Sequence, residues 1–395
     1  MIHPFAIARL PRIIFGAGSF AQLADCVRRY GERTLLVTGG HSFQHSQHWP
    51  TLLRTFEQSN ISWTQLSVRG EPSPQTVDTA VASHTNDAID VVVGIGGGSV
   101  LDAAKAVAGL LRVGGSVKDY LEGVGTGRTY RGPAVPFIAV PTTAGTGSEA
   151  TKNAVLSVQG AEGYKKSFRD EQLVPEYALV DPELLATCPP ELIAANGMDA
   201  LTQLMESYVS LRANAFTDAL VRSGIEAARD GLLDWHQRGA EAREARSRMA
   251  YAALISGIAL AQTGLGSVHG LASPLGAFFP IPHGVVCGTL VAAATQVNIE
   301  VMHQREADNP ALAKYAELGK MLCKRSFTHA ETAREALVML LMEWTEQLQL
   351  PRLSTFHVKK SDYQRIVAHS RGSSMQTNPV MLDDADIERI LLARG

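Results

Sequence analysis

The sequence of 395 residues has few cysteines and no pattern that would pair them. The four cysteines are scattered, with no Cys-x-x-Cys pair, at Cys26, Cys188, Cys287 and Cys323. This spacing argues against a disulfide framework and against a thiolate metal site, and it predicts a cytoplasmic location, where thiols stay reduced.

Basic runs, a targeting signal and long uninterrupted apolar runs are also missing. The formal net charge is −3, so neither nucleic acid nor an anionic membrane is expected as a partner. The N-terminus lacks a basic n-region and a small-residue cleavage site, which argues against a signal peptide. Because charges or glycines interrupt the longest apolar stretches, no membrane-spanning segment is expected.

What is present is typical of a globular protein with two domains. Hydrophobic residues make up 45% of the chain, and 395 residues exceed the usual size of a single core. Helical patterns at 47–58, 74–86 and 99–111 alternate with Val- and Ile-rich runs at 34–38, 61–68, 90–96, 136–141 and 178–185. Strands separated by helices predict right-handed crossovers and a parallel sheet.

Beyond Pro189 the pattern becomes almost wholly helical. Alanine is frequent and β-branched runs are scarce across 198–212, 215–235, 241–264, 309–323, 331–348 and 383–394. We therefore expect an N-terminal α/β domain over residues 1–185 and an all-α domain over residues 186–395.

A strand, a glycine turn and a helix follow one another at residues 89–111, IDVVVGIGGGSVLDAAKAVAGLL. Gly96, Gly97 and Gly98 lack a Cβ, so a ligand can approach their backbone, and a helix from Ser99 would direct free N–H groups at a phosphate. Alternatively, the glycines only turn the chain and Ser99 forms a capping box with Asp102. The parallel-sheet context favours phosphate binding, because ligands bind at the carboxyl ends of such strands.

A second glycine-containing turn, VPTTAGTGSEAT at 140–151, follows the next expected strand. Hydroxyls that suit a ribose or a diphosphate come from Thr142, Thr143, Thr146 and Ser148. The alternative is a plain turn with Ser and Thr caps. Two such loops at adjacent strand ends support nucleotide binding better than either loop alone.

Polar residues recur at helical spacing in GMDALTQLMESYVS, at residues 197–210. Most such stripes face water, and this one consists of Asp199, Gln203, Glu206 and Ser210. In the same helical domain lie His269 and His283, and imidazole is a common ligand of Zn²⁺ and Fe²⁺. Each histidine alone is more typical of a core residue, but with Asp199 they supply three ligands for one divalent cation.

Five motifs in a fixed order resemble the iron-containing (group III, metal-dependent) alcohol dehydrogenase family. They are GGGSVLDAAK at 96–105, PTTAGTGSEAT at 141–151, Lys165 with LVPEYALVDPEL at 173–184, GMDALTQLMESYVS at 197–210 and HGLASPLGAFFPIPHG at 269–284. The resemblance implies a dehydroquinate synthase-like architecture, with a Rossmann-like NAD(P) domain, a helical metal domain and a cleft between them. It also implies a metal-dependent NAD(P) oxidoreductase that interconverts a small alcohol and its aldehyde or ketone by hydride transfer.

The resemblance also implies site residues, position by position. The expected ligands of one Fe²⁺ or Zn²⁺ ion are Asp199, Gln203, His269 and His283, and all but Gln203 are also expected to be catalytic. The expected cofactor-binding positions are Gly39, Gly40, Gly96, Gly97, Gly98, Ser99, Asp102, Thr142, Thr143, Gly147, Ser148 and Lys165. A homodimer is expected, with residues 5–15 able to add a strand across its interface.

Three departures from the family pattern bear on these expectations. Gln203 stands where the family usually has histidine, and it either coordinates the ion or orients Asp199 beside it. Ser273 replaces a histidine often invoked in proton relay, which leaves water to take over that task. Gly39 stands where NAD-specific members tend to have aspartate, which slightly favours NADP over NAD, with Gly40, His41 or Ser42 near the 2′-phosphate.

Two alternative functions remain open on the sequence. One is a reductase of the maleylacetate reductase type that requires no metal, although residues 265–288 lack the clustered arginines that an acidic substrate would favour. The other is a dinucleotide-binding protein that has lost catalysis, as the changes at Gln203 and Ser273 suggest. Retention of Asp199, His269 and His283 argues against this second alternative.

Overall fold

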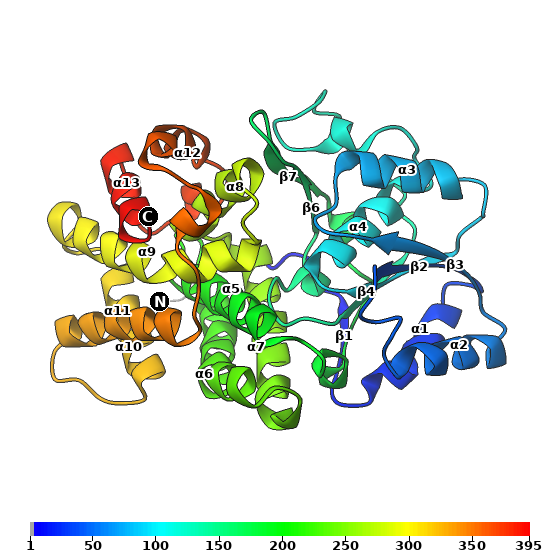
Figure 1. The fold of residues 1–395 in the computed structure, drawn as a ribbon, viewed down its shortest axis with the longest axis horizontal. Coiled ribbons are helices and arrows are strands. Elements are labelled where there is room, and N and C mark those ends of the chain that lie inside the picture. Colours follow the sequence, from blue (N-terminus) through cyan, green and yellow to red (C-terminus); the bar gives the residue numbers. More distant parts are fainter. Residues whose placement is uncertain (1–3) are drawn as a thin grey trace. The chain divides into compact units, whose positions relative to one another are not determined.

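The computed structural model describes residues 4–395, which form two compact units (Figure 1). One unit consists of Ala8–Val158 and Lys165–Cys188, and the other of Pro189–Gly395 with Gln159–Tyr164 and residues 4–7. The main division after Cys188 lies close to the boundary expected near residue 186. The turn at 159–164 and the N-terminal segment belong with the helical unit, which periodicity alone did not predict.

Six parallel strands form the sheet of the first unit. The sequence pattern predicts five of them, whereas β1, from the segment expected to add a strand across a dimer interface, pairs with β8 of its own sheet. Their order is β1-β8-β5-β4-β2-β3. Their bounds are β1 (Arg12–Phe15), β2 (Arg33–Gly39), β3 (Ser62–Val68), β4 (Val91–Gly96), β5 (Phe137–Pro141) and β8 (Tyr177–Val180). Every residue of β4 and β5 is buried, which explains their nearly continuous apolar sequences.

Four helices and a separate two-stranded sheet complete this unit. The helices are α1 (Leu23–Arg28), α2 (His48–Gln58), α3 (Pro74–His84) and α4 (Gly98–Leu110). The small sheet pairs β6 (Asn153–Val158) with β7 (Tyr164–Arg169), a pair that the sequence patterns did not predict. Because β4 ends at Gly96 and α4 begins at Gly98, the glycine turn lies at the carboxyl edge of the sheet.

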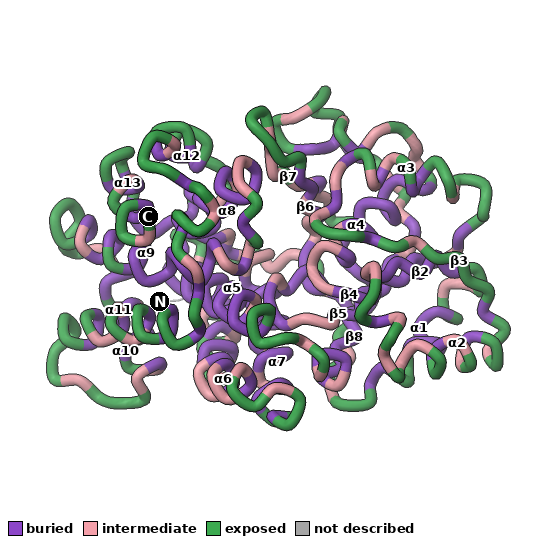
Figure 2. Tube along the Cα trace, in the orientation of Figure 1, coloured by how far each residue is buried: buried purple, intermediate pink, exposed green. Residues whose placement is uncertain are grey.

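The second unit is helical, in agreement with its alanine-rich pattern. Its helices are α5 (Pro190–Val209), α6 (Ala215–Arg238), α7 (Arg243–Thr263), α8 (Ser267–Phe278), α9 (His283–Arg305), α10 (Ala311–Cys323), α11 (Ala330–Gln347), α12 (Tyr363–His369) and α13 (Asp384–Ala393). Figure 2 shows α5 as largely buried, and almost every residue from Ile193 to Val209 is inside. The parallel sheet and the helical part together are the fold class that the sequence predicts.

Helix α9 is long and apolar enough to cross a membrane on composition alone. Within the helical unit, however, 89% of its most apolar 18-residue stretch is buried. It contacts α5, α8, α11 and α13, so its apolar side chains form the core of this unit.

Candidate metal centre and cofactor loops

The polar stripe of α5 is buried and does not face water, contrary to the usual position of such stripes. The exposed fraction is 0% for Asp199, 2% for Gln203, 8% for Glu206 and 6% for Ser210. Buried polar groups require partners, because desolvation without compensation is unfavourable. The partners of this stripe therefore show what it does.

Asp199 lies beside both histidines that the sequence singled out. Its Oδ1 atom is 3.2 Å from His269 Nε2 and 3.8 Å from His283 Nε2. These side chains come from α5, α8 and α9. The structure thus brings together the three predicted ligands, which are far apart in the sequence.

A fourth donor, Cys287, completes the cluster and was missed in the sequence. Its Sγ atom is 3.6 Å from His269 Nε2 and 3.7 Å from His283 Nε2. The candidate ligand atoms of Cys287, His269, His283 and Asp199 all lie within 4.8 Å of one another. The absence of a Cys-x-x-Cys pair had argued against a thiolate site. That expectation overlooked the His283-x-x-x-Cys287 spacing, which puts both side chains on one face of a helix.

Glu206 fixes the orientation of His269. Its Oε2 atom accepts a hydrogen bond from His269 Nδ1 at 2.6 Å, and its Oε1 accepts one from the backbone N–H of Val268 at 2.7 Å. The proton on Nδ1 leaves Nε2 as the ring atom directed at Asp199. A carboxylate behind a histidine is the usual support of a metal-binding imidazole.

Gln203 contacts Asp199 through its amide nitrogen. Nε2 of Gln203 donates to Asp199 Oδ1 at 3.3 Å, and its Oε1 accepts from the Ser256 hydroxyl at 2.9 Å. An amide nitrogen is a hydrogen-bond donor and cannot coordinate a cation. This arrangement matches the orienting role that the sequence left open for Gln203.

The ionisable groups of the cluster shift one another's pKa values. Burial opposes ionisation of Asp199, but His283 and His269 outweigh it and lower the pKa of the carboxyl group. Burial also opposes protonation of His269, yet Cys287 and Glu206 raise its pKa well above the usual value. Either a proton on His269 or a divalent ion would supply the positive charge.

The donor set fits a divalent transition metal. Asp199 Oδ2 is buried and has no hydrogen-bond partner within residues 4–395. One carboxylate oxygen therefore remains able to bind a metal ion. Imidazole nitrogen, carboxylate oxygen and sulfur are the ligands that Zn²⁺ takes in proteins, and imidazole also suits Fe²⁺. The four side chains of the cluster would hold such an ion.

The two glycine-containing loops of the first unit pack against each other. A Cβ on Gly98 would lie 2.7 Å from the Thr146 side chain, and one on Gly97 would lie 3.2 Å from Thr143 Oγ1. The backbone N–H of Thr142 also donates to Gly96 at 3.0 Å. The glycines are therefore required for contact between the loops, and they leave the partly exposed start of α4 open to a ligand.

The alternative reading of this turn, a capping box between Ser99 and Asp102, is not found at the start of α4. The N-cap is Gly97, and no side chain caps the first N–H groups. Asp102 instead accepts a hydrogen bond of 2.5 Å from the Ser148 hydroxyl in the second loop. Free N–H groups at a helix start suit a diphosphate, because the positive end of the helix dipole lies there.

Lys105 fastens the second loop to α4, a role that sequence reasoning did not assign. Its buried Nζ donates to Ser148 O, Ser148 Oγ, Thr151 Oγ1 and Asn153 O at 2.7–3.1 Å. Burial lowers the pKa of Lys105 to about 8, although Asp102 opposes the shift. The lysine in GGGSVLDAAK was visible in the sequence, but only the fold shows that it points at the other loop.

Among the remaining expected cofactor positions, three lie outside the two loops and Gly147 lies in the second loop. Lys165 on β7 forms an ion pair of 2.5 Å with Glu71. Gly39 is the last residue of β2, and the Arg69 side chain lies against Gly40. Gly147 has φ of 60°, the left-handed conformation that favours glycine, which explains its place in the second loop.

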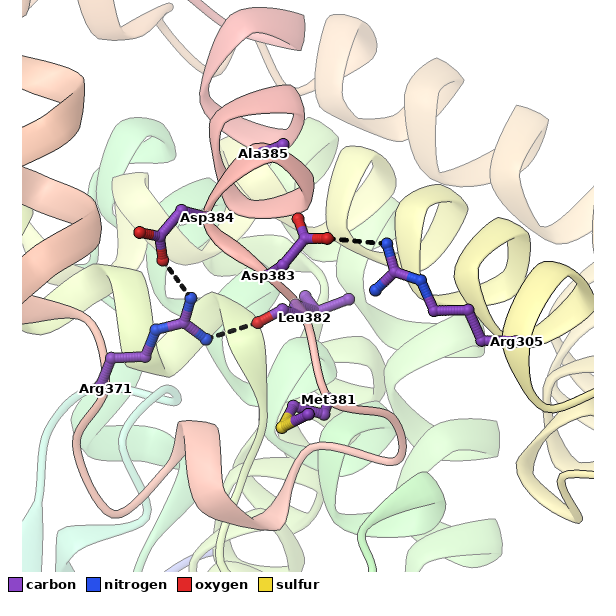
Figure 3. A pocket seen from close by; sticks show the side chains of 7 residues that line it. All are labelled: Arg305, Arg371, Met381, Leu382, Asp383, Asp384 and Ala385. Carbon is purple, nitrogen blue, oxygen red and sulfur yellow. Dashed lines mark hydrogen bonds and ion pairs between the residues drawn. The ribbon is translucent and has the colours of Figure 1, made fainter.

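A surface hollow of about 610 Å³ at the start of α13 is separate from the cluster (Figure 3). Its charged groups pair with one another, Arg305 with Asp383 and Arg371 with Asp384. None of Asp199, His269, His283 and Cys287 lines it.

Comparisons with known proteins agree with the geometry. Residues 11–182 match the family model of iron-containing alcohol dehydrogenase, and residues 193–394 match the C-terminal model of the Fe-containing alcohol dehydrogenase family.

Three similar proteins cover most or all of the chain. Alcohol dehydrogenase 4 of Schizosaccharomyces pombe is 33% identical, over 95% of this chain and 86% of that protein. The NADPH-dependent butanol dehydrogenase of Clostridium saccharobutylicum is 31% identical, over 87% and 84%. A crystal structure of 1,3-propanediol oxidoreductase has a TM-score of 0.90 at 26% identity, and covers 100% of both chains. The chain is thus an alcohol dehydrogenase or aldehyde reductase that uses a metal and a nicotinamide nucleotide, and it belongs to the iron-containing alcohol dehydrogenase family.

Proposed function

We propose that Asp199, His269 and His283 form the catalytic metal site, with Zn²⁺ or Fe²⁺ as the ion and a small alcohol or aldehyde as the substrate. The observation that carries this proposal is the buried Asp199 carboxylate facing two imidazole nitrogens at 3.2 and 3.8 Å. A bound divalent ion supplies Lewis acidity toward the oxygen of the substrate. We also propose that residues 1–185 act as the NAD(P)-binding domain and residues 186–395 as the metal-binding domain.

The surrounding residues have separate tasks in this proposal. Glu206 keeps His269 in the tautomer whose Nε2 faces the site, and Gln203 holds Asp199 in place. Ser273 lies one helical turn after His269 and is partly exposed. Its hydroxyl is able to pass a proton but does not hold a charge near neutral pH, so water must take or deliver the proton.

The nucleotide is proposed to bind over the two packed loops, with its diphosphate at the N-terminus of α4. We favour NADP(H) over NAD(H), because the end of β2 carries Gly39 and Gly40 and no carboxylate to repel a 2′-phosphate. The guanidinium-bearing side chain of Arg69, which lies against Gly40, is the residue placed to pair with that phosphate.

Arg69→Ala tests this preference. A lost charge-assisted hydrogen bond is worth about 1.5–3 kcal/mol, so KM for NADPH should rise by about tenfold or more. KM for NADH should stay unchanged. Equal effects on both cofactors, or no effect, would contradict the preference for NADP(H).

We further propose a cytoplasmic homodimer. β1 is an edge strand whose only pairing in the described chain is with β8, and Ile13 and Phe15 on it are each 39% exposed. An edge strand with apolar side chains pairs readily with a second copy. Light scattering on the wild type and on Ile13→Lys should show a dimer that the substitution weakens. None of the four cysteines forms a disulfide within the described chain, as expected in the cytoplasm.

The overall function is tested by metal analysis followed by NADPH oxidation with a panel of aldehydes. Bound metal with turnover, and loss of turnover on metal removal, is the expected result. Full turnover without metal would support the maleylacetate reductase-type alternative. Nucleotide binding without turnover on any substrate would support the inactive alternative.

A further inference from the structure

We propose that Cys287 is a metal ligand. Its thiolate supplies the fourth ligand of the site, which the family pattern expects from position 203. The inference rests on the proposed metal site and adds to it the identity of the fourth donor. It assigns an Asp-His-His-Cys set to Asp199, His269, His283 and Cys287, and it makes Gln203 a positioning residue.

The distances of Cys287 and Asp199 from the two imidazoles are close to those expected around one tetrahedral ion. With bonds of about 2.3 Å to sulfur and about 2.0 Å to nitrogen or oxygen, tetrahedral geometry separates S and N by about 3.5 Å and N and O by about 3.3 Å. Cys287 Sγ lies 3.6 and 3.7 Å from the two Nε2 atoms. Asp199 Oδ1 lies 3.2 and 3.8 Å from the same atoms. The sulfur therefore lies at a distance from both imidazoles that a shared tetrahedral ion would require.

Helix α9 holds the sulfur in that place. Cys287 follows His283 by four residues, so both side chains leave the same face of the helix. Cys287 is fully buried, and its Sγ is directed at the cluster, as its contacts with both histidines show. A thiol that only filled space would not need both imidazoles as neighbours.

Gln203 is poorly placed to be the fourth ligand. Its amide oxygen is engaged by the Ser256 hydroxyl, while its nitrogen donates to Asp199. For the oxygen to reach an ion, the amide would have to rotate, and the hydrogen bond from its nitrogen to Asp199 would be lost. The Cys287 thiol already faces both imidazoles without such a rearrangement.

A thiolate ligand changes which ion the site prefers. Sulfur is a soft donor that favours Zn²⁺, whereas a site of nitrogen and oxygen alone accommodates Fe²⁺ as well. On binding, the Sγ–H bond breaks, its proton passes to the buffer, and a sulfur–metal bond forms with no change in oxidation state. We therefore expect the chain to retain Zn²⁺ in preference to Fe²⁺.

Cobalt substitution of the full-length protein tests the inference directly. Co²⁺ replaces Zn²⁺ in tetrahedral sites, and a thiolate ligand adds a sulfur-to-cobalt charge-transfer band in the near ultraviolet. The spectrum should be compared among the wild type, Cys287→Ser, Gln203→Ala and the matched control Cys323→Ser. Cys323 lies in the same unit, where its Sγ donates to Ala336 O. Far-ultraviolet circular dichroism on each variant checks the fold.

The expected result is a charge-transfer band in the wild type, in Gln203→Ala and in Cys323→Ser, and its loss in Cys287→Ser. Competition with a chelator should show Zn²⁺ affinity reduced by more than tenfold in Cys287→Ser. Stoichiometric Co²⁺ binding to the wild type without the band would overturn the thiolate ligand while leaving the metal site intact. Absence of Co²⁺ and Zn²⁺ binding from the wild type would overturn both proposals. Because the wild-type spectrum decides alone, the test holds even if Cys287→Ser fails to fold.

Discussion

The contact between Glu206 and His269 gives a prediction whose size follows from the structure. In Glu206→Gln, a single amide oxygen replaces two carboxylate oxygens that now accept from Val268 N–H and His269 Nδ1. If the amide NH₂ faces the imidazole, Nδ1 must become the acceptor. The ring proton then moves to Nε2, the atom that faces Asp199, and blocks it as a ligand.

The expected loss of metal affinity is about 10- to 100-fold, or about 1.4–2.7 kcal/mol, the range measured when a partner behind a metal-binding histidine is removed. The assay is competition for Zn²⁺ between the apo-protein and a chromophoric chelator. Glu206→Asp, which keeps the charge but is shorter by one methylene, should fall between the wild type and Glu206→Gln. Glu335→Gln on the exposed face of α11 is the matched control. Wild-type affinity in Glu206→Gln would refute the reasoning.

Three further changes test the metal ligand, the loop contact and an ion pair in turn. His269→Ala should abolish Zn²⁺ binding and turnover while NADPH still binds in a fluorescence titration, and retained activity would contradict metal catalysis. Gly98→Ala should drive a Cβ into Thr146 and raise the Kd of NADPH by about tenfold or more, because overpacking costs about 1–3 kcal/mol. Gly372→Ala, where a Cβ meets nothing within 4 Å, should leave this Kd unchanged. Hydrogen bonds from Arg33 lower the pKa of Asp90 to about 2, so the stabilising contribution of Asp90 should be present above about pH 4 and fall away toward pH 2. Asp90→Asn should therefore be less stable than the wild type in urea titrations at pH 7 and approach it at pH 2; an equal difference at both values would exclude the ion pair as its source.

The sheet and the amphipathic helices follow from the sequence because their patterns are periodic. Helices α8 and α9 were not predicted, since their sequences are apolar almost throughout and have no stripe to detect. α8 also contains Pro274, which normally ends a helix. The strands β6 and β7 were not predicted, because short strands outside the main sheet show little hydrophobic periodicity.

The candidate site was predictable only where residue type and position already indicate ligation. The family motifs indicate Asp199, His269 and His283. They do not indicate Cys287, because Asp199 and His269 lie on other helices. Its spacing from His283 has meaning only once both residues are known to lie on α9. The place of Glu206 likewise depends on tertiary contact, since the partner of His269 is 63 positions away in the chain. Sequence reasoning assigns the chemistry of single residues, and packing decides which of them meet.

The three helices that carry the proposed ligands bring together distant parts of the chain. Asp199 and His269 are separated by 70 positions, so an ion held between them closes a long loop of the chain, as a disulfide would. Ligands that bind only the native state stabilise it in proportion to their affinity and concentration. Metal supply should therefore govern how long the helical unit resists heat and proteolysis, and a chelator should shorten the lifetime of this protein as well as stop its reaction.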